Sequence, residues 1–137
     1  DLEPETAETE EQTDGKQREE VSVFVPHLFS FAMLKLFAYR DRREDPNVDY
    51  GRHHAYDLYR SVAMMTEEDW VAARQIQEAY DEEDLMEEAR HIAEGHFGSA
   101  DERGCLRILE YLREGPSETG REEIEAFSRD LRELFGQ

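Results

Sequence analysis

The fold of this chain is decided by the apolar run Leu28-Phe29-Ser30-Phe31-Ala32-Met33-Leu34-Lys35-Leu36-Phe37-Ala38-Tyr39. Its pattern predicts a buried helix over about residues 27–44, ending near Asp45-Pro46, because a residue before proline avoids the helical conformation. Lys35 interrupts the run and is one of only two lysines, whereas arginine occurs fourteen times. An ammonium in such a helix is costly unless a carboxylate, a phosphate or a water-filled cleft receives it. Lys35 therefore indicates a site, unless its stem simply carries the ammonium to solvent at the helix edge.

Downstream of this helix the pattern predicts only helices. Thr66 begins one capping box and Ser99 a second, Asp81 is a candidate helix cap, and Gly98 is a candidate helix stop. The residues from Pro46 to Gly51 predict a loop. The sequence thus predicts a mainly α fold, a bundle of five to six helices, whose later members cover about 52–64, 67–79, 82–96, 99–114 and 120–135.

Two different segments precede the bundle. Residues 1–20 contain nine acids and two cations, so they predict a disordered tail or linker. Residues 21–25, Val-Ser-Val-Phe-Val, predict one short strand closed by Pro26. Five residues cannot form a sheet alone, so this strand needs partners. The predicted organisation is a tail over 1–20 and a helical domain over 21–137, which fits the C-terminal part of a larger α+β protein.

The composition limits which partners and which cellular compartment the sequence predicts. The net charge of −19 disfavours nucleic acid as a general partner of the surface. Residues 35–60 nevertheless carry six Lys or Arg against five acids, so a local pocket for an anion is compatible with the sequence. No stretch is long enough to span a membrane, and the acidic start is unlike a signal peptide. A single cysteine, Cys105, fits a reducing cytoplasm, with a buried, inert thiol as its expected state.

Asp57 is the candidate partner for Lys35. It lies beside the apolar stripe of the predicted 52–64 helix, where a carboxylate opposite Lys35 would form an ion pair that is buried or lines a cleft. The alternative is a surface contact of Asp57 with Arg60 or Arg52, which would contribute little to stability. His53, His54 and Asp57 suggest a metal site by residue type, but adjacent histidines point in different directions and the ligands are too few. The sequence therefore assigns no metal ligands.

Residues 21–70 resemble the second half of nucleotidyltransferase-fold proteins of the abortive-infection AbiEii toxin type. The resemblance rests on a strand, a proline, an apolar helix with one lysine, an arginine-bearing loop and a helix with an Asp-Leu-Tyr element. Here these are 21–25, Pro26, Leu34-Lys35-Leu36, Arg40-Asp41-Arg42 and Asp57-Leu58-Tyr59.

The resemblance implies transfer of a nucleotide from a nucleoside triphosphate with Mg²⁺, in a toxin–antitoxin setting. It implies that Lys35 binds the triphosphate and that Asp57 completes the catalytic site, with Arg40, Arg42 and Arg43 as contacts to phosphate or acceptor. That family's first half carries a Gly-Ser element and an Asp-x-Asp pair, and no such strand-linked arrangement is found in this sequence, because Gly98-Ser99 follows a predicted helix and not a strand. The expectation is thus a C-terminal helical region that is catalytically incomplete alone.

Partners and cofactors follow from that expectation. Mg²⁺ and the triphosphate are expected only with a missing N-terminal half or a homo-oligomer partner, and RNA or protein is the expected acceptor. No cofactor is expected otherwise. The alternative reading is a non-catalytic acidic helical module for protein interaction, with a docking face near Phe24–Phe31.

Overall fold

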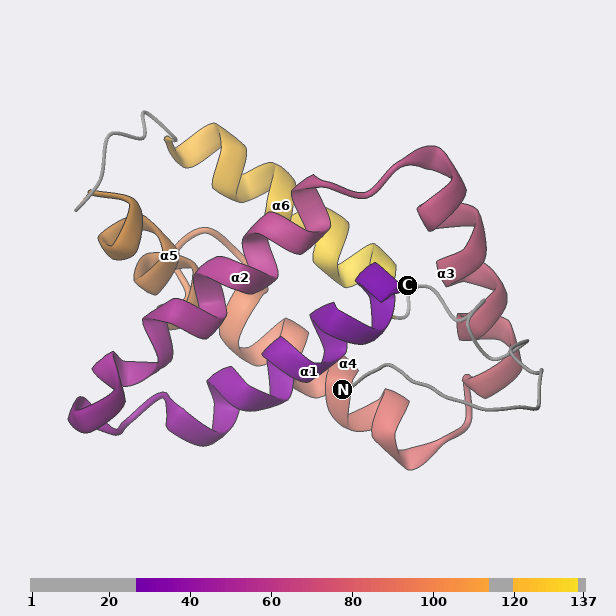
Figure 1. The fold of residues 1–137 in the computed structure, drawn as a ribbon, viewed down its shortest axis with the longest axis horizontal. Helices are drawn as coiled ribbons and strands as arrows, with labels where there is room; N and C mark the ends of the chain where they lie inside the picture. Colours follow the sequence, from indigo (N-terminus) through magenta and orange to yellow (C-terminus); the bar gives the residue numbers. More distant parts are fainter. Residues whose placement is uncertain (1–26, 114–119, 136–137) are drawn as a thin grey trace, which may run out of the picture.

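The structure is a computed structural model that describes residues 27–113 and 120–135 of the chain. Every regular element in these ranges is helical (Figure 1). The mainly α prediction is confirmed there, whereas the expected strand at 21–25 and the tail at 1–20 lie outside the described residues. The elements are α1 (His27–Arg42), the 3-10 helix η3 (Pro46–Gly51), α2 (Arg52–Ala63), α3 (Glu67–Tyr80), α4 (Asp84–Phe97), α5 (Arg103–Arg113) and α6 (Arg121–Leu134).

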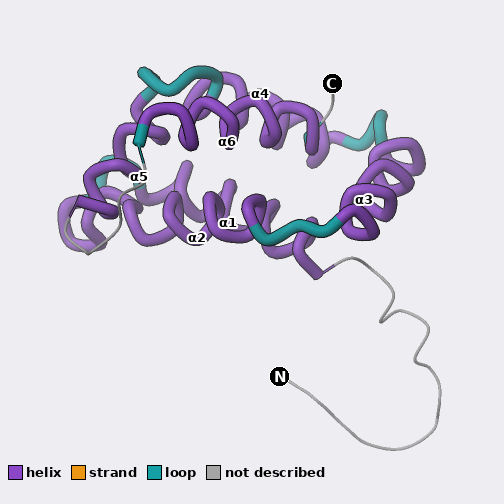
Figure 2. Tube along the Cα trace, turned by 90° about the horizontal axis from the view of Figure 1, so that it is seen from above, coloured by secondary structure: helices purple, strands orange, loops and turns teal. Residues whose placement is uncertain are grey.

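The helices form two layers. Figure 2 shows α1 and α2 in one layer and α4 and α6 in the other, with α3 closing one end and α5 the opposite end. The pair α1 and α2 makes the most extensive contact between two helices, and α2 also packs closely on α5. The predicted lysine helix therefore lies beside the next predicted helix, which is the arrangement that a site between them requires.

A tight connection sets the pairing of α1 with α2. The Asp45 carboxylate accepts a hydrogen bond of 2.9 Å from the Asn47 amide, which starts η3 directly after α1. Residues 49–51 then take the left-handed conformation, with φ of 58°, 56° and 73°. A side chain at Gly51 would be strained at that φ, and its Cβ would lie 3.2 Å from Tyr39 Cδ1. The expected loop is thus an ordered turn that brings α2 back along α1.

The core lies between the two layers. Aromatic pairs connect them: Phe29 on α1 lies 5.3 Å from Phe135, and Tyr39 on α1 lies 5.2 Å from Phe97 on α4 between ring centroids. Such ring pairs stabilise a core beyond the area that they bury. The larger buried side chains from all layers are Phe29, Leu36, Tyr39, Leu58, Val62, Met86, Ile92, Phe97, Ile108, Leu112, Ile124, Phe127, Leu131, Leu134 and Phe135.

The predicted N-terminal cap of one helix is present in the structure, and two other predicted helix starts are not. The capping box at Thr66 is confirmed, since its hydroxyl accepts from the Asp69 amide and the Asp69 carboxylate accepts from the Thr66 amide. Asp81 does not cap α4, which begins at Asp84, because its carboxylate binds Arg90 instead. Ser99 does not open α5 either.

Local hydrogen bonds explain why Ser99 does not begin α5. The Ser99 hydroxyl accepts a hydrogen bond from the Asp101 amide only two residues on, and the Glu102 amide donates to the Ser99 carbonyl. These contacts form a turn, so α5 begins later, at Arg103. Serine supports both turns and caps, and its neighbours in the chain did not distinguish the two.

Candidate functional site

Lys35 and Asp57 form an ion pair between α1 and α2. The Lys35 Nζ lies 2.9 Å from Asp57 Oδ2, and the side chains are only 19% and 17% exposed. The predicted pairing is therefore confirmed, and neither a freely solvated lysine nor a surface contact of Asp57 with the flanking arginines describes this geometry. A largely buried pair stabilises a fold mainly because removal of one partner leaves the other charge poorly solvated. Their catalytic role stays a prediction.

His54 is the second hydrogen-bond partner of the lysine. Its Nδ1 lies 3.3 Å from Lys35 Nζ. An ammonium can only donate, so His54 Nδ1 accepts and the ring proton of a neutral His54 belongs on Nε2. Burial, followed by the positive charges of Lys35 and Arg42, lowers the pKa of His54. His54 is thus held as the neutral acceptor that the lysine needs.

His53 contacts the other member of the pair. Its Nε2 lies 3.2 Å from Asp57 Oδ2, and its side chain is largely exposed. The same ring lies 6.2 Å from the ring of Tyr111 on α5, and Tyr111 stacks on Tyr56 at 4.5 Å between centroids. Adjacent histidines therefore act on opposite members of the ion pair, because successive helix residues differ by about 100° in direction.

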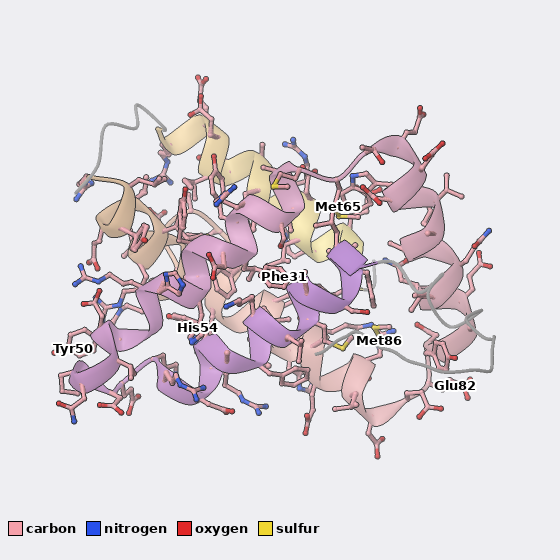
Figure 3. The ribbon with its side chains drawn as sticks, viewed as in Figure 1. Phe31, Tyr50, His54, Met65, Glu82 and Met86 are labelled. Atoms are coloured by element: carbon pink, nitrogen blue, oxygen red, sulfur yellow. The ribbon has the colours of Figure 1, made fainter. Side chains whose placement is uncertain are left out.

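An aromatic ring completes the surroundings of Lys35. The Nζ lies 5.3 Å from the centroid of Phe31, which is partly exposed one helical turn earlier on α1. Figure 3 shows Phe31 on α1 and His54 on the neighbouring helix α2. A cation over a ring face is weakly attracted to it, so Phe31 helps to hold the ammonium at the surface of the helix pair.

Two of the three arginines expected to accompany Lys35 interact with other residues instead. Arg40 contacts Asp41 at 3.1 Å and Glu88 on α4 at 3.9 Å. Arg43 donates a hydrogen bond to the Arg40 carbonyl. The pKa of His96 on α4 is lowered mainly by burial and next by the positive charge of Arg43.

Arg42 is the exception among the three. It lies seven residues after Lys35 and so shares its helix face, and its charge acts on His54. Of the predicted phosphate contacts in the described residues, Arg42 is the one whose charge acts on His54, and its role stays a prediction.

The cluster is poorly suited to hold a metal ion. Among the described residues, no three His, Cys, Asp or Glu side chains gather in a metal-binding arrangement. Asp57 Oδ2 already contacts an ammonium and an imidazole, and a divalent cation there would be repelled by Lys35. Mg²⁺ does not fit the residues described at this site.

Other predicted features are placed elsewhere. Cys105 is buried as expected, and burial raises the pKa of its thiol to about 12, whereas its inertness stays a prediction. Trp70 packs at the edge of the core, whereas Tyr80 is exposed at the end of α3. No described helix is both long and apolar enough to cross a membrane.

Sequence reasoning missed Phe31 and His54 as partners of the lysine. Phe31 precedes Lys35 by four residues and His54 precedes Asp57 by three, so helical spacing alone places each on the shared face. Tyr56 and Tyr111 carried no such signal, because their stacking joins α2 to α5 across more than fifty residues of chain.

Comparison with known proteins adds no relative. No protein family, no curated protein and no solved structure matches the chain. Arguments about function therefore rest on the residues and their geometry.

Proposed function

We propose that this chain is the C-terminal helical region of a nucleotidyltransferase-like protein, in which Lys35 and Asp57 serve a triphosphate site. The observation that carries the proposal is the ion pair of 2.9 Å between these residues, at the edge of an otherwise apolar helix. A largely buried ammonium is costly without a compensating interaction, and an ammonium is a common binder of phosphate.

The hydrogen-bonding capacity of Lys35 supports binding of an anion. An ammonium has three N–H donors. Asp57 and the Nδ1 of His54 account for two of them. With its side chain 19% exposed, Lys35 can direct the third donor to a phosphate oxygen at the rim. Asp57 then has a positioning role, since it fixes the lysine rotamer, and Arg42 on the same face adds a second positive charge.

The proposed region is incomplete as a catalyst. Phosphoryl transfer relies on positioning and on metal ions that neutralise the developing charge. The described residues bring together no group of three or more His, Cys, Asp or Glu side chains that could hold Mg²⁺, and Asp57 is paired with the ammonium. Activity would therefore need carboxylates supplied from outside the described residues, by a preceding segment or by a partner chain. RNA or protein is the proposed acceptor.

A binding experiment tests the proposal directly. Titrate the full chain with a fluorescent nucleoside triphosphate at low salt, beside Lys35→Met, Asp57→Asn and Arg90→Met. Arg90 is the matched control, because it is a similarly buried arginine paired with Asp81. A charged hydrogen bond of about 1.5–3 kcal/mol predicts a loss of roughly tenfold to a hundredfold for Lys35→Met. Equal affinity in Lys35→Met and the parent would overturn the assignment.

Labelling experiments address the second half of the proposal. With Mg²⁺ and labelled triphosphate, the chain alone should transfer no nucleotide to itself or to RNA. Transfer that Lys35→Ala abolishes would show that the chain is a complete enzyme. The coding sequence upstream of Asp1 gives an independent check, since Gly-Ser and Asp-x-Asp elements there would supply the missing groups.

A specific observation favours the second candidate, an acidic module for protein interaction. Phe31, Leu34 and Met64 on the α1–α2 layer are 41%, 68% and 57% exposed. Exposed apolar side chains of this size are found at protein–protein interfaces. A partner bound through this face would lose affinity with Leu34→Asp and keep it with Lys35→Met, whereas a triphosphate would show the reverse.

A further inference from the structure

The structure has an apolar groove on the side of α1 away from Lys35. It holds about 330 Å³ between α1, α3 and the start of α4. Two of its lining side chains, Tyr80 and Leu85, are 54% and 62% exposed, which is costly for residues of this size. Its apolar lining consists of Phe29, Met33, Ile76, Tyr80, Leu85 and Met86.

We propose that residues 21–25 of this same chain, Val-Ser-Val-Phe-Val, dock in this groove in an extended conformation. The chain enters α1 at His27, and Phe29 and Ser30, which line the groove, lie in the first turn of that helix. Pro26 separates the segment from the helix and favours an extended residue before it. Five extended residues reach about 17 Å, enough to run from the start of α1 along the groove.

The residue pattern selects the face that docks. Side chains alternate in an extended segment, so Val21, Val23 and Val25 share one face and Ser22 and Phe24 the other. The valine face is uniformly apolar and matches the lining of the groove. Docking would give residues 21–25 a packing partner, and it would also cover the exposed side chains of Tyr80 and Leu85.

Charge and attachment favour this occupant over a second copy. Residues 21–25 carry no charge, whereas the groove has Glu83 in its lining and belongs to a chain of net charge −19. Two such chains repel each other at low salt. A tethered segment also avoids the entropy cost of association, because its effective concentration at the groove is on the order of millimolar.

Two substitutions of equal charge test the docked face. In the full chain, Val23→Asp places a carboxylate against the apolar lining, while Ser22→Asp adds the same charge on the outer face. We expect Val23→Asp to lower the melting temperature by several degrees and Ser22→Asp to leave it nearly unchanged. Equal melting temperatures for Val23→Asp and the parent chain would overturn the proposal.

Disulfide trapping gives a second measurement that does not depend on stability. Cys105 is buried and its thiol has a pKa raised to about 12, so introduced cysteines can be followed in the native background. The pair Val23→Cys and Leu85→Cys should close an intramolecular disulfide at least about tenfold faster than Val23→Cys with Val71→Cys. Val71 is the control, exposed on α3 but outside the groove. Equal rates, or disulfides only between two chains, would overturn docking by the chain itself.

Discussion

Separating Lys35 from Asp57 tests how the α1–α2 pair is held. The perturbation is a double-mutant cycle with Lys35→Met, Asp57→Asn and the double variant. Methionine keeps the unbranched stem that passes Phe31 and removes the charge. Asparagine keeps the shape of the aspartate. Each single variant leaves one charge about four-fifths buried without its partner, whereas the double variant leaves neither.

The magnitude follows from the burial of the pair. Exposed ion pairs contribute about 0–1 kcal/mol, and breaking a fully buried pair costs about 3–5 kcal/mol. At 2.9 Å and with side-chain exposures of 19% and 17%, this pair lies between the two limits. His54 and His53 remain in contact with the pair and reduce the loss. We expect a coupling free energy of about 2 kcal/mol.

Urea unfolding followed by circular dichroism measures this coupling, provided that the slope of the transition is the same in all four proteins. The coupling should change little between low and high salt, because the pair is sheltered from solvent. A parallel cycle on Arg121 and Asp101, which are bonded at 2.9 Å but well exposed, should give a smaller and salt-sensitive value. A coupling below about 0.5 kcal/mol for Lys35 and Asp57 would refute the reasoning.

Three further predictions concern single residues. The pKa of His54 is lowered in the folded chain, so the unfolded chain takes up the proton first as the pH falls below about 6.5. The free energy of unfolding should therefore decline below that pH. Unfolding curves at pH 7 and pH 5 should show a smaller decline in His54→Asn than in the parent chain. Cys105 should react with a thiol reagent at mildly alkaline pH only as fast as the chain unfolds globally, and prompt labelling would contradict its burial. Gly51→Ala should destabilise the chain by about 1–3 kcal/mol, whereas Gly95→Ala, in an exposed helix position with nothing within 4 Å, should stabilise it by about 0.5–1 kcal/mol in the same urea assay.

The sequence predicted what depends on periodicity and on the cost of a buried charge. Helical spacing placed the six helices to within a few residues, and the isolated ammonium of Lys35 pointed to Asp57 on the next helix. Helix starts were less predictable, because Asp81 and Ser99 can bind nearby groups other than the helix amides. Arg90, nine residues away, decided the outcome for Asp81.

The interaction partners of Arg40, Arg42 and Arg43 could not be predicted from the charge composition of residues 35–60. Residues 35–60 contain the cations expected of an anion site, but helix geometry sends neighbouring residues in different directions. Arg40 pairs with Glu88 on α4, and the charge of Arg43 acts on His96 of α4. Both interactions depend on how α4 packs on α1. Only Arg42, two helical turns after Lys35, was positioned by spacing alone.

This divergence limits how strongly the described residues can bind an anion. The excess of one positive charge over residues 35–60 is opposed by −20 on the rest of the chain, and Asp57 neutralises much of the field of Lys35. What remains is one directed N–H donor with Arg42 nearby. In the proposed function, such a site would attract a triphosphate weakly and lose it as salt rises. Lys35 would then set the position of a phosphate, and tight binding would require further donors or metal ions from outside the described residues.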